Sequence, residues 1–265
     1  LNKLNLIGAD FEGSLKSIDE RLGANTSPIQ IPVGNEHALR GMIDLVKMKA
    51  FTYKAIEDIA LTEEEIPAEL QEMADKYRAR LIERVAEYDD EALTKYLEGQ
   101  ELSENDIKRA IRKGVISGKF FPILGGDNRT ATTQLLLNAV VEYLPSPIDV
   151  PPVEGINPKT SEAETRERKN ESPFSGLGFK VMTDPHVGRL LYVRIYSGML
   201  KTGQEVYNAS KQVRERIGKL VLLHADQREL VEEAYAGEIV AVVGLRDTTT
   251  GNTLCDEAHP ILLES

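Results

Sequence analysis

The chain has 265 residues, of which 41% are hydrophobic and 28% are charged, and its formal net charge is −11. These values are typical of a soluble protein with about two globular domains and argue against a disordered chain. The sequence contains no run of about 18 apolar residues, which is the signal of a membrane span. The single cysteine, Cys255, excludes an internal disulfide and a cysteine-rich zinc site.

A mixed α/β pattern occupies the chain up to a proline-rich break at 145–152. The sequences Thr62-x-x-Glu65 and Ser103-x-x-Asp106 have the form of a capping box, which marks the start of a helix. Apolar residues after these starts recur at spacings of three and four, which is the helical period. In chain order, we predict a helix over 11–22, strands over 29–33 and 42–53, helices over 67–85 and 103–114, a strand over 120–124 and a helix over 132–144.

Short strands punctuated by glycine follow the break. The prolines and the polar run over 157–172 predict a linker and exposed loop over 146–172, because proline blocks strand pairing and a charged run has little to bury. Beyond it we predict strands over 174–181, 189–196, 205–207, 216–223, 238–245 and 261–264. Several short strands at this spacing predict a closed or nearly closed barrel. The expected fold class is therefore α/β followed by an all-β barrel.

Several motifs occur in a fixed order along the chain. Residues 2–5, Asn-Lys-Leu-Asn, have the form N-K-x-D with asparagine in the last place, and residues 7–11 continue as Ile-Gly-Ala-Asp-Phe. The series goes on at 28–34, 41–45, 134–137, 143–147, 184–190, 196–198, 214–218 and 250–254. This ordered series resembles bacterial elongation factor G, a family of translational GTPases that moves messenger and transfer RNA through the ribosome.

The resemblance implies a chain that begins near the end of a GTP-binding G domain. Residues 1–26 and 118–145 would form the C-terminal part of that domain, residues 27–117 its inserted α+β G′ subdomain, and residues 173–265 the domain II β-barrel. The phosphate-binding loop G-x-x-x-x-G-K-[ST] and the switch regions would precede this chain. Its nearest match, at 114–120, is one residue short and has Phe in place of the metal-binding hydroxyl.

We therefore expect a fragment with no catalytic residue of its own, which neither hydrolyses GTP nor binds a nucleotide tightly. The complete protein would be a GTP hydrolase that binds GTP or GDP together with Mg²⁺.

The resemblance also implies a guanine-reading site made of Asn2, Lys3 and Asn5 together with Gly126 and Asp127. In the family, an aspartate in the last motif position accepts two hydrogen bonds from guanine. Asn5 offers one acceptor oxygen and presents N–H donors instead, so we predict weakened guanine recognition and tolerance of xanthine. Glycine at 126 is expected to loosen its loop, and Asp127 to add negative charge. An artefact of the terminus and an ordinary loop variant are the alternatives.

Charge is unevenly distributed and points to two ribosome-facing surfaces. Residues 51–120 hold 17 acidic and 11 basic side chains; these fit a solvated helical face, while the resemblance implies contact between G′ and the ribosomal stalk protein. Residues 180–220 hold 8 basic and 3 acidic side chains, which fit either an ordinary surface or contacts with phosphates. The resemblance favours contact with small-subunit ribosomal RNA. The candidate RNA-binding residues are Arg189, Arg194, Lys201, Arg214 and Arg216.

Other polar residues have simpler interpretations. The lone histidines His186, His224 and His259 lack catalytic partners and metal-ligand spacing, so we expect them to be structural. The run from Asp89 to Glu91 is expected to be a helix cap and a solvated turn rather than a metal site.

Two other classes of function stay open. One is a non-catalytic ribosome-binding module or diverged paralogue, which Asn5 and the Gly-Asp-Asn sequence at 126–128 support. The other is a release, recycling or ribosomal-protection relative of the same GTPase group. The lack of an apolar targeting segment predicts a cytoplasmic protein without membrane attachment, and nothing in the sequence indicates an oligomeric state.

Overall fold

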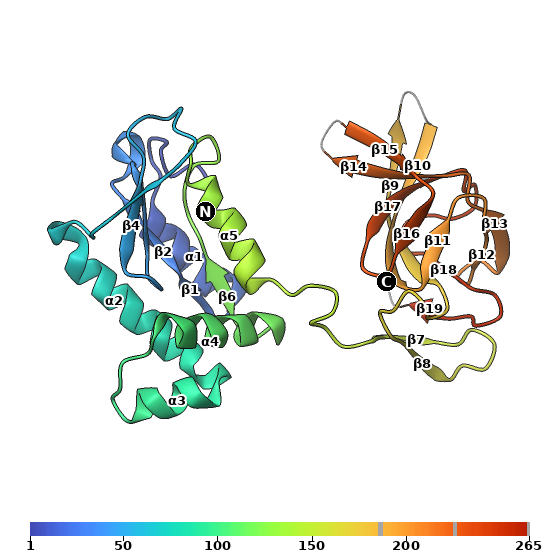
Figure 1. Ribbon diagram of the computed structural model, residues 1–265, viewed down its shortest axis with the longest axis horizontal. Coiled ribbons are helices and arrows are strands. Elements are labelled where there is room, and N and C mark those ends of the chain that lie inside the picture. The colour runs from blue at the N-terminus through green and yellow to red at the C-terminus, as the bar shows by residue number, and fades with distance from the viewer. Residues whose placement is uncertain (185–187, 225–226, 264–265) are drawn as a thin grey trace. The chain divides into compact units, whose positions relative to one another are not determined.

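The protein folds into two compact units, Leu1–Ser146 and Pro147–Ser265, each with its own hydrophobic core (Figure 1). The computed structural model describes residues 1–184, 188–224 and 227–263. His186, predicted to be structural, and the last residue of the strand predicted over 261–264 lie outside the described residues. No helix in the described part of the chain is long and apolar enough to span a bilayer.

The first unit is mixed α/β, as predicted. Its elements are α1 (Phe11–Leu22), β1 (Thr26–Pro28), β2 (Gln30–Val33), the 3-10 helix η1 (Glu36–Ala38), β3 (Gly41–Asp44), β4 (Lys49–Thr52), β5 (Thr62–Glu64), α2 (Ala68–Val85), the 3-10 helix η2 (Ala86–Tyr88), α3 (Asp90–Leu97), α4 (Glu104–Ile116), β6 (Phe121–Ile123) and α5 (Thr133–Tyr143). An antiparallel sheet has the order β2-β3-β4-β5, and β1 pairs with β6 in parallel. Ile31, Ile43, Leu81, Ile111 and Phe120 are fully buried in its core.

Capping residues bound two of the predicted helices. Asp10 is the N-cap of α1 and accepts a hydrogen bond from the backbone N–H of Gly13 at 2.8 Å, and Gly23 ends the helix in the left-handed conformation. Ser103 and Asp106 form the predicted capping box of α4. This helix runs two residues beyond its predicted end.

The strand predicted over 42–53 is instead a hairpin of β3 and β4. The carboxylate of Asp44 accepts a hydrogen bond from the backbone N–H of Val46 at 2.8 Å, and Met48 has φ +55°, so the backbone reverses here. Leu45 and Val46 are buried although they lie in the turn. The apolar pattern therefore continues through the reversal and hides it.

The predicted capping box at Thr62 and Glu65 is wrong. Thr62 belongs to β5, which pairs with β4, and the side chain of Glu65 binds Lys49. The helix α2 starts only after Pro67. This N-cap residue has a non-helical backbone conformation, and no side chain caps the helix there. Residues 62–64 therefore pair as a strand and do not start the helix.

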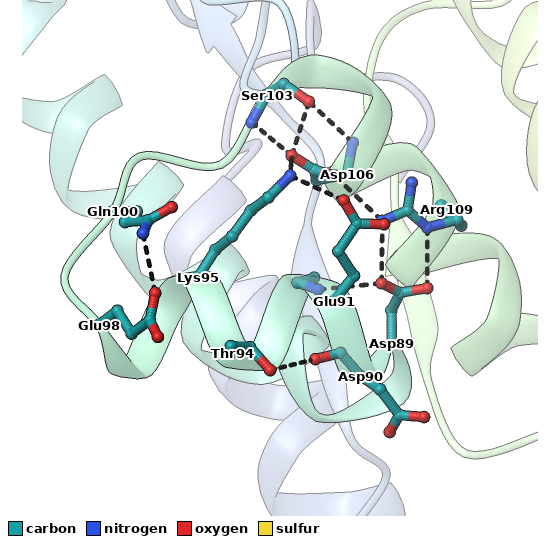
Figure 2. A network of polar contacts seen from close by, with 11 residues as sticks. Asp89, Asp90, Glu91, Thr94, Lys95, Glu98, Gln100, Ser103, Asp106 and Arg109 are labelled. Atoms are coloured by element: carbon teal, nitrogen blue, oxygen red, sulfur yellow. Dashed lines mark hydrogen bonds and ion pairs between the residues drawn. The ribbon is translucent and has the colours of Figure 1, made fainter.

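A network of ion pairs joins α3 to α4 (Figure 2). Asp89 caps α3 by accepting a hydrogen bond from the N–H of Ala92 at 3.0 Å, which confirms the predicted cap. Its buried carboxylate also binds Arg109, with 2.8 Å between Oδ2 and Nε. Asp106 accepts bonds from Arg109 and Lys95, each at 3.0 Å. The carboxylates of Asp89 and Asp106 therefore have structural partners that hold α3 and α4 together.

The second unit is built of short strands, as predicted, and its strand pairs are antiparallel. Its strands are β7 (Val153–Ile156), β8 (Ala163–Arg166), β9 (Ser175–Asp184), β10 (Gly188–Ser197), β11 (Met199–Lys201), β12 (Glu205–Asn208), β13 (Val213–Arg216), β14 (Lys219–His224), β15 (Gln227–Val231), β16 (Glu233–Tyr235), β17 (Ile239–Val243), β18 (Thr253–Cys255) and β19 (Leu262–Leu263). Eight of them form one sheet in the order β13-β12-β18-β9-β10-β17-β14-β15. Leu191, Ile195, Leu200 and Ile217 are buried in its core.

This sheet nearly returns on itself. Only Ile217 and Gly218 separate β13 from β14 along the chain. The N–H of Ile217 donates to the carbonyl of Gln204 at 2.9 Å, and the N–H of Gly218 donates to the carbonyl of Val243 at 2.8 Å. One extended segment therefore borders β12 at one end and β17 at the other, as in a barrel.

The region predicted as linker and loop over 146–172 contains a hairpin. Its strands, β7 and β8, pair with each other, and β7 also pairs with β19 near the end of the chain. Asn157 fastens the turn by accepting a hydrogen bond from the N–H of Lys159 at 2.9 Å. A Cβ atom at position 155 would lie 2.6 Å from the carbonyl oxygen of Leu262, which is too close, so glycine fits there. Because the third strand lies about 100 residues away, local composition missed this small sheet.

Candidate functional site

Two segments far apart in the sequence meet at the start of the chain. The N–H of Gly126 donates to the carbonyl of Leu1 at 3.1 Å, and the N–H of Leu4 donates to the carbonyl of Gly126 at 3.2 Å. The side-chain oxygen of Asn2 accepts a hydrogen bond from the N–H of Asn128 at 3.2 Å. The first motif and the loop after β6 are therefore held in a fixed register.

A cavity of about 180 Å³ opens where these segments meet the first turn of α5. Of the predicted base-reading residues, Asn2, Gly126 and Asp127 line the cavity, and Lys3 and Asn5 are not among its lining residues. Lys3 is exposed with φ +65°, and the buried Oδ1 of Asn5 has no hydrogen-bond partner within the described residues. The cavity is lined by Leu1, Asn2, Leu124, Gly125, Gly126, Asp127, Asn128, Thr132, Thr133 and Leu136.

The loop after β6 is tightly fastened, contrary to the expectation that glycine would loosen it. Gly126 has φ +148°, and a Cβ atom there would lie 2.6 Å from Oγ1 of Thr132. That hydroxyl donates to the carbonyl of Asp127 at 3.1 Å, as does the hydroxyl of Thr130 at 2.9 Å. The close contact between Gly126 and Thr132 explains the glycine, and sequence analysis missed both threonines because their role depends on the folded loop.

The charge of Asp127 is directed into the protein. Its side chain is only 2% exposed, and its carboxylate pairs with the guanidinium of Arg129 at 3.2 Å. The N–H of Arg129 donates to the same carboxylate at 3.1 Å. The expected added negative charge is thus largely balanced within the loop, and the lining that the cavity presents to a ligand is mainly apolar.

The five candidate RNA-binding residues have different local partners. Arg189 donates to the carbonyls of a loop after β17, including that of Arg246 at 2.7 Å, and Arg216 donates to the carbonyl of Gly203 at 2.8 Å. Carboxylates pair with Lys201 and Arg214, each at 2.7 Å. Arg194 makes no hydrogen bond or ion pair with the described residues, and its guanidinium lies over the ring of Tyr196 at 5.4 Å from the ring centroid. Arg194 therefore has the freest charge of the five.

Sequence analysis also missed a buried carboxylate. Glu215 accepts hydrogen bonds from the backbone N–H groups of Arg246, Asp247 and Thr248 at 2.6, 2.8 and 2.9 Å. Burial opposes ionisation, but these bonds and the Thr248 hydroxyl outweigh it and hold the pKa of Glu215 below its usual range. Glu215 and Arg189 thus fasten the same loop, which gives Arg189 a structural role. No signal in the sequence marked this residue, because the strand predicted over 216–223 begins after Glu215.

Comparisons with known proteins agree with this architecture. Residues 188–255 match the family described as elongation factor Tu domain 2. Over 98% of its length, the chain is similar to a protein of Thermus thermophilus whose crystal structure is known, with a TM-score of 0.74 and 27% sequence identity. The chain spans 36% of the length of that protein. Together these similarities fit a mixed α/β unit followed by a second unit that is similar to elongation factor Tu domain 2.

Proposed function

We propose that the chain is part of a translation factor of the elongation factor G type, a GTP-dependent ribosomal translocase. The observation that carries this proposal is the meeting of residues 1–5 with residues 124–128 at one cavity. The same chain then continues into an elongation-factor domain 2. In this proposal residues 27–117 form the G′ subdomain that contacts the stalk protein, and residues 173–265 dock on small-subunit ribosomal RNA.

The cavity suits the base of a guanine nucleotide. A closed cavity of about 150 Å³ holds a benzene ring, so an open one of about 180 Å³ accommodates much of a purine. The mainly apolar lining would pack against the base, and the side-chain amide of Asn2 would hold its edge, because the N–H groups of residues 126–128 are already bonded within the protein. The phosphates and Mg²⁺ require a G-x-x-x-x-G-K-[ST] loop, which this sequence does not contain. That loop would supply phosphoryl-transfer chemistry in a cytoplasmic parent protein.

Ribosome-stimulated GTP turnover tests the proposal. We expect the complete gene product to hydrolyse GTP, with turnover raised by ribosomes, and to advance messenger RNA on pre-translocation complexes. We expect the 265-residue chain alone to bind ribosomes without hydrolysing GTP. A complete protein that neither hydrolyses GTP nor binds ribosomes would contradict the proposal.

A non-catalytic ribosome-binding module or a diverged paralogue of recycling, release or ribosomal-protection type is the second candidate. The specific observation in its favour is Asn5, whose buried Oδ1 lacks a partner among the described residues. A complete protein that binds ribosomes without GTP turnover would support the non-catalytic module. Turnover without translocation, combined with subunit splitting or peptide release, would support the paralogue.

A further inference from the structure

The outward face of β10 combines aromatic and basic side chains. Val193 and Ile195 point into the core and are fully buried. The alternating residues Tyr192, Arg194 and Tyr196 lie on the other face and are partly exposed. Strand alternation therefore places two tyrosine rings on either side of one guanidinium group along a single strand.

Neighbouring segments add two more cations to this row. The ammonium group of Lys180, on β9, lies 5.9 Å from the ring centroid of Tyr192. Arg168 reaches the ring of Tyr196, 6.0 Å from its centroid, next to Arg194 at 5.4 Å. These are cation–π distances, so each cation is held beside an aromatic ring.

No carboxylate lies at the registered neighbours of this row. Leu177 and Lys180 of β9, and Ile239 and Ala241 of β17, are the residues paired with Arg194 and Tyr192. Lys180 and Arg194 have no hydrogen bond or ion pair within residues 1–184, 188–224 and 227–263. The row thus differs from the sites of the candidate RNA-binding lysine and arginine that carboxylates neutralise.

Arg168 is fixed in place without losing its charge. One terminal nitrogen donates to the carbonyls of Pro147 at 2.8 Å and Val150 at 3.2 Å, while its buried Nε has no partner in the described part of the chain. Burial, followed by the nearby charge of Arg194, lowers the pKa of Arg168 from its usual value. Two like charges share one tyrosine ring, and an anion would relieve their repulsion.

We propose that this row, the β10 cation–aromatic face (Lys180, Tyr192, Arg194, Tyr196 and Arg168), is a docking surface for single-stranded RNA. Bases or riboses would lie against the tyrosine rings, and phosphates would meet the guanidinium groups, because single-stranded RNA is bound through this combination. The inference rests on the proposed function, in which the second unit contacts ribosomal RNA. It moves the contact from five scattered basic residues to one strand face.

Binding of a fluorescently labelled single-stranded oligoribonucleotide to the 265-residue chain tests this surface. Arg194→Gln is compared with Arg214→Gln, which removes the same charge from a residue already paired with Glu257. Arg194→Gln should weaken binding about tenfold and lower the slope of log affinity against log salt by about 0.7, as for one lost phosphate contact on a single strand. Arg214→Gln should leave both quantities unchanged. A far-ultraviolet circular dichroism spectrum confirms that each variant is folded.

The tyrosines supply a second readout. Tyr192→Phe should retain binding and Tyr192→Leu should weaken it about fivefold or more, because only the first keeps a ring for stacking. Equal effects of the two arginine variants, or no RNA binding by the unmodified chain, would overturn the proposal.

Measuring the binding of the same variants to small ribosomal subunits distinguishes a failure of the proposed surface from a failure of the proposed function. If the chain binds subunits and Arg194→Gln has no effect, the surface is wrong and the proposed function stands. If the oligoribonucleotide binds through Arg194 but subunits are not bound, the surface is supported and the proposed ribosome contact fails.

Discussion

Asn5 presents an amide where the resemblance to elongation factor G implies an aspartate. A carboxylate accepts two hydrogen bonds from guanine, and charge-assisted bonds of this type contribute about 1.5–3 kcal/mol each. In the complete protein, Asn5→Asp should tighten GTP binding about tenfold or more and weaken XTP binding. Competition titrations of both nucleotides measure this change. Undiminished preference of the unmodified protein for GTP over XTP would show that Asn5 does not limit guanine recognition.

Gly126 offers a test of loop packing. Gly126→Ala places a Cβ atom 2.6 Å from Thr132 Oγ1 in a backbone conformation with φ +148°. Gly8→Ala is a matched control, since Gly8 also has a positive φ but no atom within 4 Å of the added Cβ. We expect Gly8→Ala to cost about 1 kcal/mol in the free energy of unfolding of the first unit, and Gly126→Ala to cost about 1–2 kcal/mol more. Urea denaturation compares them, and equal losses would contradict the packing argument.

At the scale of elements, the ion-pair network between α3 and α4 makes the first unit sensitive to acid. Arg109, followed by Lys113, holds the pKa of Asp89 well below its usual range, despite burial. Ser103, followed by Lys95, does the same for Asp106. A lowered folded-state pKa stabilises the protein above the unfolded value, about 3.9, and that stability is lost as the pH falls through the folded value.

The free energy of unfolding of the first unit should therefore fall as the pH drops from about 5 to 3. Asp106→Asn should lower it by about 1–3 kcal/mol at pH 7 and flatten its pH dependence. Glu83→Gln on α2 removes the same charge from an exposed side chain and serves as the control. Chemical denaturation across this pH range is the measurement. A profile for Asp106→Asn parallel to that of the unmodified chain would contradict the assignment.

Sequence was most informative where a few consecutive residues determine an element. Asp10 and Gly23 bound α1, and Ser103 with Asp106 starts α4, because each signal acts within one helical turn. The hairpin of β7 and β8 could not be predicted in the same way, since its partner β19 lies far along the chain.

The candidate site shows the same limit. The resemblance nominated Asn2 and Gly126, but only the fold shows that they line one cavity and that Asn5 does not. Thr132 and Glu215 escaped notice because each acts on backbone groups whose position is set by tertiary structure. Residue type alone does not reveal such a role.

For the whole molecule, two separate cores predict that damage to one unit stays local. Ile111 is fully buried in the first unit and Leu220 in the second, and their cores share no residue. Replacing either by alanine should cost its own unit about 2–5 kcal/mol, because substitutions that share no packing partners act separately. Hydrogen exchange with mass spectrometry should then show faster exchange in the unit that carries the substitution. Loss of protection across both units from either variant would contradict independent cores.

The order of strands in the second unit has a consequence for its synthesis. In the sheet, β18 lies between β9 and β12, although it follows both along the chain. The growing barrel therefore has a gap until Thr253–Cys255 has left the ribosomal tunnel. The core of the first unit is already complete at Tyr143. A chain made from its N-terminus can thus fold this α/β unit first, while β9 and β12 stay unpaired on that side until β18 has been made.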